Sequence, residues 1–171
     1  EFYRSKYDEE LRGSLMYGLG FNGYYNNLHE LKLLIKKKDV NFCKFSNSTL
    51  KLDGMIYPSL NTLDTAVKNN VNISKNFIIT GPNAAGKTTV IKAAMLNVIF
   101  SQQLSLGFYD KATITPFRYL HCYINIPDTS SRDSLFQAEA RRCKNIIQTI
   151  DDNPEHKHFC LFDELYSGTN P

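Results

Sequence analysis

The sequence lacks the features that mark membrane-spanning and disulfide-bonded proteins. None of its apolar runs reaches about eighteen residues, so no membrane-spanning helix is predicted. Its four cysteines are widely scattered and include no C-x-x-C pair, which argues against a zinc site or a disulfide framework and favours a reducing, intracellular setting. The net charge of +3 is too small to demand or exclude a nucleic-acid partner. The charged N-terminal residues do not form a signal peptide.

The content of the sequence fits one α/β domain preceded by a helical segment. Leucines and an isoleucine at helical spacing predict an amphipathic helix within residues 8–38, ending at the solvated lysines 36–38. The glycines of GLGFNG, residues 18–23, follow no strand, so we interpret them as a turn between helices. From residue 40 onward, strands alternate with helices. The predicted strands are residues 40–45, 51–58, 77–80, 117–124 and 158–162, and the predicted helices begin near residue 87 and span 133–150.

The stretch TGPNAAGKTT, Thr80 to Thr89, has the spacing of a phosphate-binding loop between a strand and a helix. Its glycines let the backbone turn tightly with N–H groups pointing inward, and the helix start adds positive potential. Lys87 is predicted to reach the β- and γ-phosphates, Thr88 to bind Mg²⁺, and Thr89 to touch the α-phosphate. The full predicted ATP-binding set is Gly81, Pro82, Asn83, Ala84, Ala85, Gly86, Lys87, Thr88 and Thr89.

The stretch FCLFDE, Phe159 to Glu164, supplies the carboxylates that such a loop needs on a second strand. Asp163 at the strand end is predicted to hold Mg²⁺, directly or through water. Glu164, directly after it, is predicted to polarise the attacking water as a general base. An acid in that position favours hydrolysis over kinase chemistry, because a kinase must keep water out.

Two further groups have competing interpretations. His156 and His158 precede a strand, and a solvated strand entrance is favoured over a metal site because no third ligand is evident. Ser134 stands near the start of the helix over residues 133–150, where Ser134 or Asp133 is predicted to cap the helix. A helix start also binds anions, so contact with a γ-phosphate across a dimer is the alternative.

Together these motifs resemble the ATPase domain of the MutS family of mismatch-repair proteins. The resemblance runs through TGPNAAGKTT, through SLFQAE at residues 134–139, and through DELYSGT at residues 163–169, with Tyr57-Pro58 matching an upstream pair. It covers residues 40–171 well and residues 1–39 weakly, as the end of a helical lever region. SGTNP at residues 167–171 departs from the family pattern and indicates a divergent branch. The absence of an initial methionine and the polar end suggest a fragment.

The resemblance implies an ABC-type P-loop NTPase with a mixed β-sheet flanked by helices, occupying residues 40–171. It also implies ATP and Mg²⁺ as cofactors, a homo- or hetero-dimer, and Ser134 as a γ-phosphate contact supplied to the partner's site. Gln102 is matched to a nucleotide-sensing loop, and residues 67–71 to a loop that contacts adenine. DNA contacts, including contacts with mismatched duplex, would be made through domains outside residues 1–171.

The leading hypothesis is therefore Mg²⁺-dependent ATP hydrolysis that drives a dimeric DNA mismatch-recognition clamp, in the cytoplasm or nucleus. The alternative is a MutS-like or SMC-like ATPase that acts in recombination or chromosome structure without mismatch preference. A third hypothesis is an ATP-gated dimerisation module that binds ATP and barely hydrolyses it.

Overall fold

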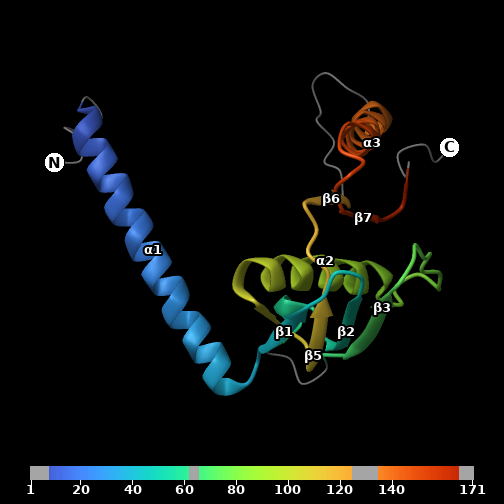
Figure 1. Cartoon of the computed structure of the whole chain (residues 1–171), viewed down its shortest axis with the longest axis horizontal. Coiled ribbons are helices and arrows are strands. Elements are labelled where there is room, and N and C mark those ends of the chain that lie inside the picture. The colour runs from blue at the N-terminus through green and yellow to red at the C-terminus, as the bar shows by residue number, and fades with distance from the viewer. Residues whose placement is uncertain (1–7, 62–65, 125–134, 166–171) are drawn as a thin grey trace. The chain divides into compact units, whose positions relative to one another are not determined.

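The computed structural model describes residues 8–61, 66–124 and 135–165 (Figure 1). The chain separates into two units, with the division between Val40 and Asn41. The first unit holds one long helix, and the second holds the sheets and the remaining helices. The candidate site lies entirely in the second unit.

The first unit contains helix α1, Glu9–Lys37, which has 29 residues. The Asp8 carboxylate caps it by accepting hydrogen bonds from the backbone N–H groups of Glu10 and Leu11, each at 3.1 Å. Acidic residues occupy the first turn and basic residues the last, as the helix dipole favours. Lys38 ends the helix in the left-handed conformation, with φ 62°.

The turn that we predicted at residues 18–23 is wrong, because α1 runs through these glycines without a break. Each glycine in a helix interior costs about 1 kcal/mol relative to alanine. That cost is spread over a helix that is capped at both ends, and the residues between the glycines are leucine, phenylalanine and asparagine rather than proline. Taken by itself, the helix of the first unit has no buried residue.

The second unit is built on a mixed five-stranded sheet with the order β3-β2-β5-β1-β4. Strand β1 runs parallel to β5, and the other neighbouring pairs are antiparallel. The strands are β1 (Asn41–Phe45), β2 (Leu50–Met55), β3 (Asn69–Ile73), β4 (Leu106–Gly107) and β5 (Lys111–Ile114). A short 3₁₀ helix, Pro58–Leu60, follows β2.

Helix α2, Lys87–Leu104, packs on one face of this sheet and forms the core with it (Figure 1). Leu52, Ile114 and Val98 are completely buried there. Asn97 of α2 is also completely buried, and its amide is fully used. Its nitrogen donates to the carbonyls of Ile56 and Ala93, and its oxygen accepts from the backbone N–H of Phe108 at 2.7 Å. Asn97 therefore fixes α2 to the chain segments at the ends of the sheet.

A second, two-stranded parallel sheet pairs β6 (Tyr119–Tyr123) with β7 (His158–Phe162). Helix α3, Leu135–Asp152, connects these strands along the chain. Phe159 and Leu161 of β7 join the α2 core, with Leu120 and Cys122 of β6 packed against it. Alternate residues of the same strands point to the opposite face. The α3 side chain of Arg142 donates to the Cys122 carbonyl at 3.2 Å.

The predicted strand over residues 77–80 is wrong, because these residues have no strand structure and Phe77, Ile78 and Ile79 are exposed. Their apolar, β-branched character favours a strand only where a neighbouring strand pairs with it. No strand among the described residues pairs with this segment. Strands β3 and β5 were not predicted. Asparagines alternate with Val71 and Ile73 in β3, and asparagine is a poor predictor of strands.

No helix in the described ranges combines the length and apolar character needed to cross a membrane.

Replacing Gly20 and Gly54 with alanine tests the backbone conformations described above, because the two positions should respond in opposite ways. Gly20 lies inside α1 with no atom near its prospective Cβ, so Gly20→Ala should stabilise α1 by up to about 1 kcal/mol. Gly54 in β2 has φ +63°, and a Cβ there would collide with the Asp110 carboxylate. Gly54→Ala should therefore lower the free energy of unfolding by more than about 1 kcal/mol. This is the order of the energetic cost of a strained left-handed residue.

The measurements are helicity by circular dichroism for Gly20→Ala and urea unfolding for Gly54→Ala. Helicity that falls in Gly20→Ala would contradict the continuous helix. Unchanged unfolding of Gly54→Ala would contradict the described conformation of β2.

Candidate functional site

The chain makes a tight turn immediately before α2. Ala84 and Gly86 both have left-handed backbone conformations, with φ 61° and 85°. Gly86 is the N-cap of α2, and the backbone N–H of Ala85 donates to the Pro82 carbonyl at 3.3 Å. Glycine adopts such angles without steric cost, whereas alanine does so only where the surrounding structure holds it. The chain therefore turns tightly between residues 80 and 87, although no strand precedes this turn.

The Lys87 side chain folds back over this loop. Its ammonium group donates to the carbonyl oxygens of Gly81 and Pro82, both at 2.9 Å. The positive charge thus lies beside the loop backbone and the first turn of α2. No acidic residue occurs in that turn, so nothing in it offsets the positive end of the helix dipole. A flexible lysine and a helix N-terminus that favours anions meet at one place.

The two predicted metal ligands lie together. The Thr88 hydroxyl donates to a carboxylate oxygen of Asp163 at 2.7 Å, although 75 positions separate them in the chain. Thr88 is in the first turn of α2, and Asp163 directly follows β7. The backbone N–H of Asp163 donates to the Tyr123 carbonyl at 2.9 Å, which continues the pairing of β6 with β7. The strand pair therefore positions the carboxylate at the start of α2.

Glu164 follows Asp163 and is exposed, with φ 46°. This left-handed conformation is uncommon for a residue with a side chain and costs about 1–3 kcal/mol. It turns the chain sharply at the end of β7. The two acids therefore differ in environment, since Asp163 is half-buried against Thr88 while Glu164 stands in solvent.

Other predicted site residues have different outcomes. Ser134 and the segment 167–171 lie outside the described residues. Gln102 lies in α2 and not in a loop. Its side-chain oxygen accepts from the backbone N–H of Phe117 at 2.6 Å, so it holds α2 to the segment before β6. The predicted adenine-contacting loop is also wrong in part, because residues 69–71 belong to β3 and pair with β2.

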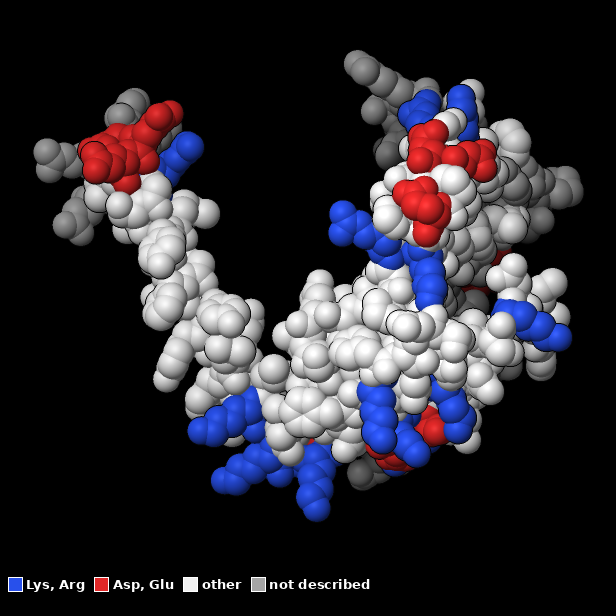
Figure 2. Space-filling model, viewed as in Figure 1, with Lys and Arg blue, Asp and Glu red and all other residues white. Residues whose placement is uncertain are grey.

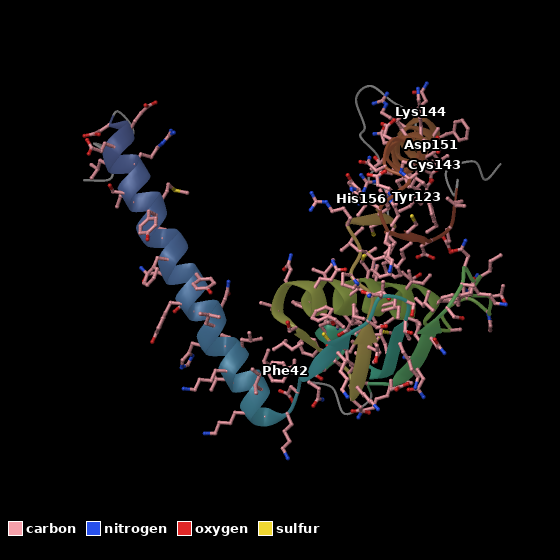
Figure 3. All side chains as sticks on the ribbon, in the orientation of Figure 1. Phe42, Tyr123, Cys143, Lys144, Asp151 and His156 are labelled. Carbon is pink, nitrogen blue, oxygen red and sulfur yellow. The ribbon has the colours of Figure 1, made fainter. Side chains whose placement is uncertain are left out.

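His158, the first residue of β7, belongs to a histidine cluster that no sequence pattern predicted. His158 faces His121 of β6, with Nδ1 and Nε2 3.0 Å apart, and Tyr119 stacks on the His158 ring at 4.8 Å between centroids. The ring of His156, which is labelled in Figure 3, lies 5.9 Å from the Tyr119 ring between centroids. Within the described ranges, no group of three or more His, Cys, Asp or Glu is placed to hold a metal ion.

The hydrogen bonds of this cluster define its protonation. His158 Nε2 is 2.9 Å from the Asn153 carbonyl, which only accepts, so Nε2 carries a proton. In neutral His158, Nδ1 then accepts from Nε2–H of His121. Burial lowers the pKa of His121 below its usual 6.5, and the charges of His158 and Arg142 lower it further. His121 therefore loses its proton at a lower pH than an unperturbed histidine does.

Comparison with known proteins identifies a family that the chain matches. The model of a family described as MutS domain V matches residues 77–171, which include the loop, β6, α3 and β7.

The chain is also similar to bacterial proteins named endonuclease MutS2. It is 30% identical over 131 residues to that of Staphylococcus haemolyticus, covering 74% of this chain and 16% of the relative. It is 26% identical over 167 residues to that of Staphylococcus aureus, covering 95% of this chain and 21% of the relative. The chain thus spans about a fifth of the length of these relatives.

The His121–His158 pair predicts loss of stability in acid. A buried histidine whose folded pKa lies below its unfolded value stabilises the fold above the unfolded pKa of about 6.5. That stability is lost as the pH falls through the folded pKa. Urea unfolding of the wild type should therefore become easier between about pH 7 and about pH 5, and His121→Gln should flatten this dependence.

The matched control is His29→Gln, since His29 is exposed on α1. His29→Gln should retain the wild-type pH dependence. An equal acid sensitivity in wild type and His121→Gln would contradict the assignment.

Proposed function

The chain belongs to the MutS family, and from this premise we propose that its loop and the end of β7 form a Mg²⁺–ATP site that hydrolyses ATP. The observation that supports the proposal most is the Thr88–Asp163 contact at the start of α2. A phosphate loop alone binds anions, whereas a threonine hydroxyl and a carboxylate beside it add the ligands of a divalent cation. Thr88 and Asp163 are 75 positions apart in the chain, so the fold and not the sequence brings them together.

The donor set fits magnesium. Mg²⁺ takes oxygen ligands at about 2.1 Å in octahedral geometry, so neighbouring ligand oxygens are about 3 Å apart. The Thr88 hydroxyl and the Asp163 carboxylate oxygen are 2.7 Å apart, close to that spacing. One carboxylate suffices, because substrate phosphates and water complete the coordination of Mg²⁺ in such sites. Thr88 and Asp163 would hold Mg²⁺, which would neutralise the negative charge that develops on the phosphate during hydrolysis.

The remaining residues then have definite roles. The backbone N–H groups of residues 81–89 bind the phosphates at the N-terminus of α2. Lys87 exchanges its two carbonyl acceptors for the β- and γ-phosphates, because a charged phosphate oxygen is a stronger acceptor for an ammonium than a carbonyl. Glu164 takes a proton from the attacking water as its oxygen bonds to the γ-phosphorus, and the bond from that phosphorus to the bridging oxygen breaks to release ADP. Its exposure leaves it accessible to that water.

We also propose a dimeric arrangement in which Ser134 of one subunit contacts the γ-phosphate held by the other. This proposal is supported by the family and by the position of Ser134 immediately before α3. Hydrolysis would then depend on assembly as well as on nucleotide.

Two DNA-related functions remain for the full-length protein. The first is a mismatch-recognition clamp, supported by membership in the MutS family. The second is a MutS-like ATPase that acts on DNA without mismatch preference. Similarity to proteins named endonuclease MutS2 favours the second, since that name describes action on nucleic acid without reference to mismatches.

Lys87→Ala should weaken ATP binding at least tenfold, because it removes the only side-chain cation of the loop. Binding is measured by isothermal titration with Mg²⁺–ATP. Lys75→Ala, an exposed lysine outside the loop, serves as the matched control and should bind as wild type does. Unaltered affinity in Lys87→Ala would count against the phosphate-loop proposal.

Glu164→Gln should leave ATP affinity within about threefold of wild type and slow hydrolysis about 10²- to 10⁴-fold, the range of general-base catalysis. Single-turnover hydrolysis by the full-length protein separates this outcome from slow product release. Glu155→Gln is the control, because Glu155 is exposed and lies before β7. A full-length wild type that binds ATP without hydrolysing it would support the dimerisation-module hypothesis instead.

The full-length protein should bind DNA in an ATP-dependent manner. Its affinities for mismatched and fully paired duplexes, compared at one salt concentration with and without ATP, decide between the two DNA-related functions. A mismatch preference that ATP abolishes supports the repair clamp. Equal affinity for both duplexes supports the alternative.

A further inference from the structure

The backbone carbonyl of Cys122 lies on the edge of β6 that faces away from β7. The next carbonyl along the strand, that of Tyr123, accepts from the backbone N–H of Asp163 and so points toward the chain that continues β7. Successive carbonyls of a strand point to opposite edges, so the Cys122 carbonyl points the other way. Within the described ranges, β6 pairs with β7 alone. This carbonyl therefore needs a donor that is not a strand.

Arg142 of α3 supplies that donor. Its guanidinium donates to the Cys122 carbonyl through Nη2 at 3.2 Å and through Nε at 3.4 Å. A charged donor makes a stronger hydrogen bond than a neutral one. Ile146, one turn further along the same face of α3, is buried, so this face is the one that packs on the protein. Arg142 thus joins the middle of α3 to the outer edge of β6.

The charge of Arg142 also acts on the residue before Cys122. Burial lowers the pKa of His121 below its usual 6.5, and the charges of His158 and Arg142 lower it further. The guanidinium therefore lies close to both the carbonyl and the imidazole. The pKa of His121 reports the position of Arg142 without reference to ATP.

Helix α3 links the two halves of the proposed nucleotide chemistry. It begins at Leu135, directly after Ser134 in the chain, and Arg142 lies about two turns further on. The strand to which Arg142 attaches α3 is the one whose Tyr123 carbonyl accepts from Asp163. One guanidinium thus connects the helix that follows Ser134 with the strand pair that leads to Asp163.

We propose that Arg142 is a positioning residue for ATP hydrolysis, because it sets the start of α3, and with it Ser134, relative to the strand pair of the nucleotide site. This inference rests on the dimeric arrangement proposed above. ATP binding does not require the contact, since Phe159 and Leu161 hold β7 in the core that α2 shares. The rate of hydrolysis, which would use Ser134 of the partner subunit, does require it.

The first test compares ATP affinity with single-turnover hydrolysis in the full-length protein. Arg142→Met should slow hydrolysis about 10- to 100-fold, the range expected when a reacting group is misplaced. ATP affinity should stay within about twofold of wild type, because the contact acts on the transition state and not on binding. Arg142→Lys, which keeps a charged donor, should recover most of the rate.

Lys144→Met is the matched control for these variants. Figure 2 shows that α3 carries both basic and acidic side chains, and Lys144, labelled in Figure 3, is an exposed cation of the same helix. Its replacement removes the same charge without touching β6. Lys144→Met should therefore hydrolyse ATP as the wild type does.

The second test asks whether Arg142 acts through Ser134. Ser134→Ala should slow hydrolysis, and the double variant with Arg142→Met should be little slower than Ser134→Ala alone, because both changes remove one contribution. Titration of the histidine resonances of residues 1–171 by NMR checks the contact itself. The pKa of His121 should rise in Arg142→Met and stay unchanged in Lys144→Met.

The outcomes separate this inference from the proposed function. If Ser134→Ala is slow while Arg142→Met is as fast as Lys144→Met, the inference is wrong and the dimeric arrangement stands. ATP affinity that falls together with hydrolysis in Arg142→Met would show a general structural role instead. An unchanged pKa of His121 in that variant would contradict the contact. Unchanged hydrolysis in Ser134→Ala would contradict the dimeric arrangement, and the inference would fall with it.

Discussion

The hydrogen bond between Thr88 and Asp163 is the contact on which the candidate site depends. It joins the first turn of α2 to the end of β7, and it brings a hydroxyl and a carboxylate to the turn that precedes α2. Each partner is held by a different part of the fold. The turn at Gly86 makes α2 begin at Lys87, so that Thr88 lies in its first turn. The pairing of β6 with β7 fixes the position of Asp163 at the end of β7. Neither element forms the site without the other.

The core explains how these two elements keep their positions. Phe159 and Leu161 of β7 pack into the same cluster as Ala94 and Val98 of α2. The distance between the helix start and the strand end is thus fixed by close packing, which resists small displacements. Asn97 and Gln102 add hydrogen bonds from α2 to the backbone on either side. The polar side chains of Asn97 and Gln102 therefore position α2, whereas its first turn contributes Thr88 to the candidate site.

The sequence predicted the parts of this arrangement that local chemistry determines. The glycine loop, the helix after it, and β7 with its terminal acids all followed from spacing and apolar pattern, and the structure places Thr88 beside Asp163 as that pattern required. The failures arose where distant partners decide the outcome. Residues 77–80 have strand-forming side chains and no paired neighbour, while β3 has poor strand formers that pair with β2. The glycines of α1 suggested a turn, but its two end caps and the helix-forming residues outside the glycine segment sustain one helix. The His121–His158 contact depends on strand register, which no short pattern reveals.

The central claim is that Thr88 and Asp163 act as one Mg²⁺–ATP site, and a double-mutant cycle tests it most directly. ATP affinity would be measured with and without Mg²⁺ for wild type, Thr88→Val, Asp163→Asn and the double variant, with Thr149→Val of α3 as the control. The account predicts that each single variant weakens binding only when Mg²⁺ is present, and that the double variant loses little more than either single one. Losses that add, or that are equal without Mg²⁺, would contradict it.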